Sequence, residues 1–136
     1  MPSPATLSRF VAMVESGAFL QAIEEFYAPT ATMQENFSPP RVGKAALLAN
    51  ERKVLVGTRT VTSQCVGPVL VNGDIVVIRW LFHFTGNDGR VLRIEELAYQ
   101  RWEGEEIVQE QFFYDPGQMK TPVPPSYAGG STSPSP

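Results

Sequence analysis

A carboxylate lies among apolar residues in the stretch TATMQENFSPP, residues 30–40. If this stretch alternates as a strand, Ala31, Met33, Glu35 and Phe37 point to one side, and the other side is polar. An ionised group in an apolar setting is costly, so the group either raises its pKa or acquires a partner. Because a general base needs a pKa near the working pH, Glu35 is the first candidate catalytic residue.

Two later strands carry the same anomaly. The apolar side of IVVIRWLFHF is unbroken and consists of Val76, Ile78, Trp80, Phe82 and Phe84, so the even-numbered side is expected to face inward. In the following strands the inward side is Leu92, Ile94, Glu96, Ala98, Gln100 and Trp102, then Val108, Glu110, Phe112 and Tyr114. Three carboxylates are therefore predicted inside, at Glu35, Glu96 and Glu110, with one or two of them at strand ends that reach solvent.

Other kinds of catalytic site have little support. His83 is the single histidine and falls on the mixed side of its strand, which disfavours a Ser-His-Asp device or a histidine metal site. Asp74, Asp88 and Asp115 lie in or beside turns without calcium-loop spacing, and Cys65 is typical of a small core residue. The sequence predicts neither a metal nor a cofactor.

Composition limits the partners. The chain has 136 residues, enough for one domain with a core, a net charge of −3 and no basic cluster, which disfavours nucleic acid. Its apolar runs are too short for a transmembrane helix, and residues 1–10 lack the pattern of a signal peptide. One cysteine suits a reducing compartment, so a cytoplasmic protein without membrane contact is predicted.

The predicted elements form an α+β fold. Helices are expected over 4–15, 18–27 and 44–56, and strands over 30–40, 58–71, 75–85, 91–102 and 107–115. The three N-terminal helices should pack on a curved antiparallel sheet and leave a cone open at one end for a small hydrophobic molecule. This domain should span 1–115, and the Pro/Gly/Ser-rich residues 116–136 should form a flexible tail.

The outer sheet side mixes charged, aromatic and aliphatic residues, which favours a homodimer. The residues are Arg79, His83, Arg93, Glu95, Tyr99, Arg101 and Phe113. The alternative is an exposed face with cross-strand Arg–Glu pairs.

The motifs FYAPTATM, VGKAAL and LAYQRWEGEEIVQEQFFYD resemble the NTF2-like superfamily, with its SnoaL-like and ketosteroid isomerase-like members, over residues 7–115. The resemblance implies an NTF2-like cone and places Glu35 where the isomerases carry their catalytic aspartate. Phe10 and Ala98 stand where those enzymes carry a tyrosine and a protonated aspartic acid, and neither can donate a hydrogen bond. Losing one such donor typically costs a hundredfold or more, which argues against a standard steroid isomerase. Glu96, on the same face as Ala98, could supply a neutral donor.

Two other resemblances imply different residues. SnoaL-type cyclases use an acidic residue near the end of the last strand, and Asp115 is the nearest match, although a turn or cap role is equally consistent. Dehydratases and epoxide hydrolases of this fold need a histidine or an Asp-Arg-Asp set, and the alternation places no arginine or histidine inside.

The sequence thus predicts a cofactor-independent acid–base enzyme for a small hydrophobic carbonyl compound, of isomerase, cyclase or dehydratase type, with Glu35 as base and Glu96 as second catalytic residue. The predicted ligand-binding residues are Phe10, Tyr27, Met33, Ile78, Trp80, Phe82, Ala98, Glu110, Phe112 and Tyr114. A noncatalytic module that binds an apolar ligand or dimerises is the alternative.

Overall fold

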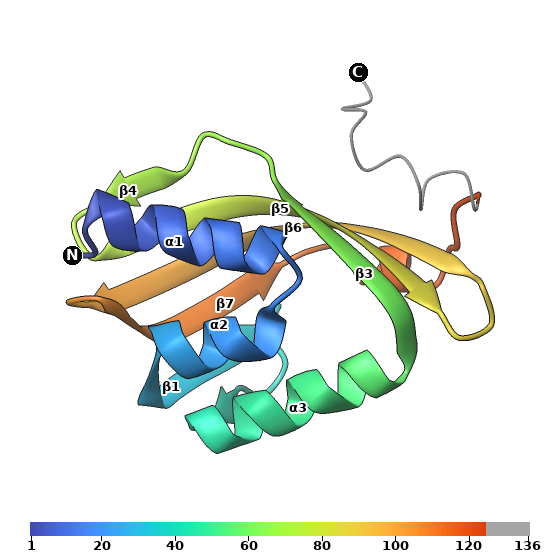
Figure 1. Cartoon of the computed structure of the whole chain (residues 1–136), viewed down its shortest axis with the longest axis horizontal. Coiled ribbons are helices and arrows are strands. Elements are labelled where there is room, and N and C mark those ends of the chain that lie inside the picture. Colours follow the sequence, from blue (N-terminus) through green and yellow to red (C-terminus); the bar gives the residue numbers. More distant parts are fainter. Residues whose placement is uncertain (125–136) are drawn as a thin grey trace.

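Three helices cover the concave side of one strongly curved sheet in the computed structural model, which describes residues 1–124 (Figure 1). The helices are α1 (Pro4–Glu15), α2 (Phe19–Phe26) and α3 (Lys44–Val56), and a short 3-10 helix, η1 (Pro116–Met119), follows the last strand. The strands are β1 (Tyr27–Glu35), β2 (Arg41–Val42), β3 (Thr58–Cys65), β4 (Leu70–Asn72), β5 (Ile75–Gly86), β6 (Val91–Glu103) and β7 (Glu106–Phe113). The predicted α+β cone is confirmed. No helix among the described residues is long and apolar enough to cross a bilayer.

The first helix begins and ends where local chemistry dictates. Ser3 caps its N-terminus by accepting a hydrogen bond from the Thr6 amide, and Pro4 occupies the first turn, where its missing N–H costs nothing. Gly17, with a φ of 86°, lets the chain turn directly after the helix. The predicted limits of this helix, and those of α3, are confirmed.

The second helix ends before the predicted position, and β1 starts earlier than expected. The backbone is already extended at Tyr27, so Pro29 lies inside β1 rather than terminating a helix. Its missing N–H is tolerated because the pairing of β1 with β7 is irregular between Tyr27 and Thr32.

The sheet is mixed rather than antiparallel. Its order is β2-β1-β7-β6-β5-β3, with β4 also on β5, and β1 runs parallel to β7 while the other pairs are antiparallel. The prediction of an antiparallel sheet was wrong for this one pair, which joins the first strand to the last. The predicted strand 58–71 is also divided into β3 and β4, with a cis Gly67-Pro68 bond between them.

The predicted inward side of the long strands is confirmed. Val76, Ile78, Trp80 and Ala98 are buried beneath the helices. In β7 the prediction was wrong at Ile107, which lies on the other side of the predicted alternation but is fully buried. The pairing of β6 with β7 shifts register between Arg101 and Trp102 of β6, and this irregularity lets both Ile107 and Glu110 of β7 point inward.

The expected tail is partly folded against the sheet. Residues Pro116–Met119 form η1, and Val123 pairs with Val91 of β6. The remainder of the predicted tail, residues 125–136, lies outside the described part of the chain.

Candidate active site

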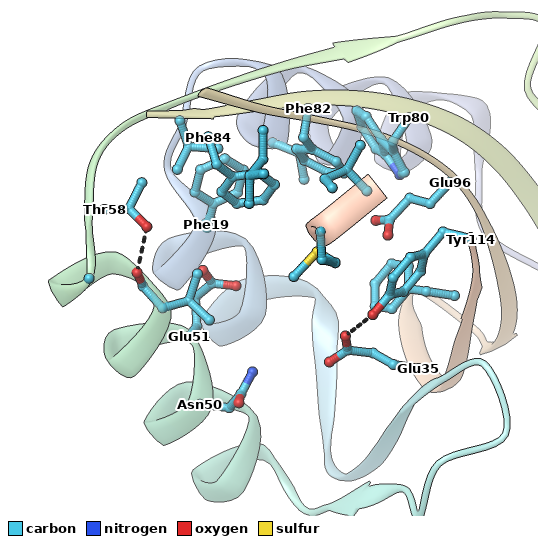
Figure 2. A pocket seen from close by; sticks show the side chains of 18 of the residues that line it. Phe19, Glu35, Asn50, Glu51, Thr58, Trp80, Phe82, Phe84, Glu96 and Tyr114 are labelled. Carbon is cyan, nitrogen blue, oxygen red and sulfur yellow. Dashed lines mark hydrogen bonds between the residues drawn. The ribbon is translucent and has the colours of Figure 1, made fainter. Parts of the chain in front are cut away.

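A cavity of about 760 Å³ opens between the helices and the concave side of the sheet (Figure 2). One wall is aromatic: Phe82 lies between Trp80 and Phe84, with ring centroids 5.9 and 5.8 Å away, and faces Phe19 of α2 at 6.3 Å. Glu35, Glu51, Glu96 and Glu110 also line it. The cavity therefore combines the apolar wall that holds an organic ligand with groups that can exchange protons.

Glu35 ends β1 and lines this cavity, but it is paired. Tyr114 Oη donates a hydrogen bond of 2.6 Å to Oε1, and Arg41 Nη2 lies 2.5 Å from Oε2. Burial raises the pKa of Glu35, but the hydrogen bonds from Tyr114 and Arg41 outweigh it, so that its pKa lies below the usual value. Of the two outcomes expected for Glu35, a raised pKa or a partner, the structure shows the partner, supplied by Tyr114 and Arg41.

Arg41 comes from the two-residue strand β2, which pairs with β1 and sets Arg41 opposite Met33. It lines the cavity and also lowers the pKa of Glu51, although burial leaves that pKa raised overall. Its Nε is buried and has no hydrogen-bond partner among the described residues. The expectation that no arginine faces inward was wrong, because Arg41 lines the cavity between the carboxyl groups of Glu35 and Glu51 and interacts with both.

The pKa of Glu96 is shifted in the opposite direction from that of Glu35. It lies on β6 opposite Trp80, its side chain points into the cavity, and no hydrogen bond to that side chain is found within residues 1–124 (Figure 2). Burial raises the pKa of Glu96 to about 8, and the negative charges of Glu110, Glu35 and Glu51 add to the effect. At neutral pH, Glu96 is therefore mostly a neutral acid that can donate a hydrogen bond.

Glu110 belongs to a buried hydrogen-bond network at the floor. Tyr27 Oη donates to its Oε1, and Gln100 Nε2 donates to Oε2 at 2.7 Å. Trp102 Nε1 in turn donates to Gln100 Oε1 at 3.0 Å. Burial raises the pKa of Glu110 to about 7, while the hydrogen bonds from Gln100 and Tyr27 lower it. Since both oxygens are engaged by protein donors, this network stabilises the floor more readily than it meets a ligand.

The sequence-predicted residues are largely brought together. Those that line the cavity are Phe10, Tyr27, Met33, Glu35, Trp80, Phe82, Glu96, Glu110, Phe112 and Tyr114. Ile78 and Ala98 face each other across β5 and β6, are fully buried and do not line it, because they lie in the core beneath α1 and α2. Asp115 caps η1 by accepting a 2.8 Å hydrogen bond from the Gly117 amide and does not line the cavity.

The comparisons with known proteins agree with this architecture. Residues 7–110 match the SnoaL-like domain family. The chain belongs to that family. No curated protein matches its sequence.

Solved structures show the same NTF2-like fold at low sequence identity. An NTF2-like protein of unknown function from Burkholderia pseudomallei K96243 has a TM-score of 0.73 and 15% identity, over 85% of this chain and 92% of that one. A candidate SnoaL-like polyketide cyclase from Jannaschia sp. CCS1 has a TM-score of 0.73 and 14% identity, over 97% of each chain. A ketosteroid isomerase-like fold from Catenulispora acidiphila, in complex with trimethylamine, has a TM-score of 0.71 and 17% identity, over 91% and 97%.

Several residues at the site of this SnoaL-like chain were missed from the sequence. Glu51 shares a helix face with Leu47 and Leu48, so it carried the same signal as Glu35, a carboxylate on an apolar face. Met119, Lys120 and Pro122 line the cavity as well, and the composition of their segment gave no such signal. Arg90 lines the cavity beside these three residues, and no alternation of side chains predicts any of the four.

Proposed function

We propose that the chain is a cofactor-independent acid–base enzyme acting on a small hydrophobic carbonyl compound, in the manner of an isomerase, cyclase or dehydratase. The observation that carries this proposal is that two carboxyl groups in one cavity have pKa values displaced in opposite directions. The pKa of Glu35 is lowered by Tyr114 and Arg41 against its burial, whereas burial raises that of Glu96 to about 8. Such a divergence assigns one group as base and the other as acid.

The proposed chemistry is proton transfer at the carbon next to a carbonyl group. The Glu35 carboxylate accepts the proton as the C–H bond breaks, and the electron pair moves into the C–C–O system to form an enolate. The neutral Glu96 carboxyl donates a hydrogen bond to the enolate oxygen, which supplies a donor that Phe10 and Ala98 cannot. The protonated Glu35 then returns the proton to carbon.

In this arrangement Glu35 is a weak base that is already ionised at neutral pH. Its partners keep it ionised below the pH at which an ordinary glutamate protonates. They also reduce its proton affinity, so the driving force for proton removal must come from stabilising the enolate rather than from a raised pKa. That requirement makes Glu96 as important as Glu35.

The test is exchange of carbon-bound protons, which needs no knowledge of the natural substrate. The probe is 2-acetylnaphthalene in D2O, and NMR follows loss of the methyl proton signal. The protein should accelerate exchange, and Glu35→Gln should reduce the rate about a hundredfold or more, because a positioned base contributes roughly that much. Glu24→Gln, on the exposed side of α2 and away from the cavity, is the matched control and should leave exchange unchanged.

The pH dependence gives a second readout. Exchange should fall as the pH rises through about 8, because Glu96 then loses the proton with which it stabilises the enolate. In Glu96→Gln this alkaline fall should disappear, since the amide donates a hydrogen bond without titrating. Exchange that is equal in the wild type and in Glu35→Gln would refute the assignment of the base.

A noncatalytic ligand-binding role is the second candidate, and one observation favours it. Both oxygens of Glu35 are already engaged, by Tyr114 and Arg41, as in a fixed structural pair. On this reading the wild type binds 2-acetylnaphthalene without accelerating exchange, and Glu35→Gln binds it with unchanged affinity. Calorimetric titration of both proteins, beside the exchange assay, separates the two candidates.

A further inference from the structure

The C-terminal segment completes the wall of the cavity where β7 stops. β7 pairs with β6 only as far as Leu97 and Phe113, so residues 91–96 of β6 have no β7 partner along that edge. The following segment takes that place. Gln118 exchanges two hydrogen bonds with the backbone of Glu95, at 2.9 and 3.1 Å, and the Val123 amide donates to the Val91 carbonyl at 2.8 Å.

This segment faces the ligand space and adds little to the core. Met119, Lys120 and Pro122 line the cavity. No residue of η1 is buried, and the SnoaL-like match ends at residue 110. The segment therefore contacts the cavity and the edge of the sheet rather than the core.

Charge is distributed unevenly along the cavity. Four carboxyl groups, Glu35, Glu51, Glu96 and Glu110, line it on the side of β1, α3, β6 and β7, with Arg41 among them. At the mouth, the positive charge of Arg90 is offset by Asp88, which accepts a 2.9 Å hydrogen bond from the Arg90 amide and lies 3.7 Å from its Nε.

Lys120 is exposed, lines the cavity and carries a further positive charge there. Its ammonium group has no ion pair or hydrogen bond within the described residues. An anionic group would be attracted beside Lys120, whereas the positive charge of Arg41 inside the cavity is already paired with Glu35.

We propose that residues 116–123 are the specificity element of the cavity and that Lys120 selects ligands with a carboxylate at the end remote from the reacting carbonyl. The orientation rests on the proposed function, because Glu35 and Glu96 hold the carbonyl end. Met119 and Pro122 cover the apolar body of the ligand near the mouth. The substrate class is thus a hydrophobic or aromatic carbonyl compound that bears a carboxylate.

Two matched probes test this proposal by binding alone. The probes are 2-acetylnaphthalene and 6-acetyl-2-naphthoate, which differ by one carboxylate opposite the ketone, and calorimetry at low salt measures their affinities. The wild type should bind the carboxylate about two- to fivefold more tightly, the range of a solvent-exposed ion pair. Lys120→Gln should abolish this preference and Lys120→Glu should reverse it.

The control is Lys53→Gln, which removes the same charge from an exposed position of α3 that does not line the cavity. It should retain the preference, and added salt should reduce the preference in the wild type. Equal affinity of the wild type for both probes would overturn the proposal, as would an equal loss of preference in Lys53→Gln and Lys120→Gln. Since no turnover is measured, loss of the exchange activity in the Glu35 test would leave this result standing and would separate the two proposals.

Discussion

Glu35 and Glu96 are the same residue type in the same cavity, and their surroundings give them opposite properties. The alternation of side chains located both, because strand periodicity is a local property of the sequence. The direction of each pKa shift was not predictable in this way. At Glu35 it depends on the hydrogen bond from Tyr114 and on Arg41, which reaches Glu35 through the pairing of β1 with β2. At Glu96, burial dominates the shift.

The raised pKa of Glu96 predicts how stability depends on pH. A carboxyl group whose pKa is higher in the folded than in the unfolded state binds more protons when folded, so its contribution to stability is complete below the unfolded pKa and is lost as the pH rises through the folded one. For Glu96 the interval runs from about 4.5 to about 8. The free energy of unfolding should therefore fall across this interval.

Glu96→Gln should reduce that fall by about 1–3 kcal/mol, a figure lowered from the full pKa displacement because the carboxyl group borders the cavity. Urea unfolding at pH 5 and pH 8.5 measures the difference in each protein. Glu110, with a pKa raised to about 7, should leave a smaller residual fall in the variant. An unchanged pH dependence in Glu96→Gln would show that Glu96 titrates normally in the folded protein.

At the scale of elements, the sequence predicted what is local and missed what is not. Helical periodicity and capping by Ser3 set the bounds of α1, and period-two alternation located β5 and β6. The parallel pairing of β1 with β7 brings together segments far apart in the chain, so no local pattern encodes it. The same limit hid η1, which is ordered by Gln118 bonding to the edge of β6.

Phe10 is the aromatic residue that packs α1 against both α2 and the sheet. Phe10 is 2% exposed, and its ring meets Phe26 of α2 at 5.4 Å and Trp102 of β6 at 5.9 Å, both edge-on. Phe10→Ala should reduce the free energy of unfolding by about 3–5 kcal/mol, as expected for a large aromatic side chain removed from a core.

Urea denaturation measures this loss, with Val56→Ala as the control. Val56 is 81% exposed at the end of α3, so its truncation should change stability by no more than about 0.5 kcal/mol. A small loss in Phe10→Ala would mean that Phe10 acts as a wall of the cavity, which it also lines, rather than as a support of the fold.

At the scale of the whole molecule, the outer side of the sheet exposes several large apolar side chains. Leu97 and Tyr99 are each 45% exposed and Phe113 is 36% exposed, and Phe37 packs edge-on against Phe113 at 6.0 Å. The predicted Arg–Glu pairs are present beside them, since Glu95 contacts Arg79 and Arg93 at 2.6 and 2.8 Å. An apolar centre with a charged rim is the usual anatomy of a protein interface.

We propose that two copies of the chain pair through this outer face. Light scattering after gel filtration should give the mass of a dimer, and Tyr99→Glu should give a monomer, because it would bury an unpaired carboxylate in the interface. Val56→Glu is the matched control: Val56 is 81% exposed at the end of α3, on the helical layer and not on the sheet, and the variant should remain dimeric. A wild type that is monomeric at every concentration, or a Val56 variant that dissociates as readily as the Tyr99 variant, would show that the outer face is only a solvated surface. In that case the outer face would be a solvent-exposed sheet surface that the cross-strand Arg–Glu pairs help to stabilise.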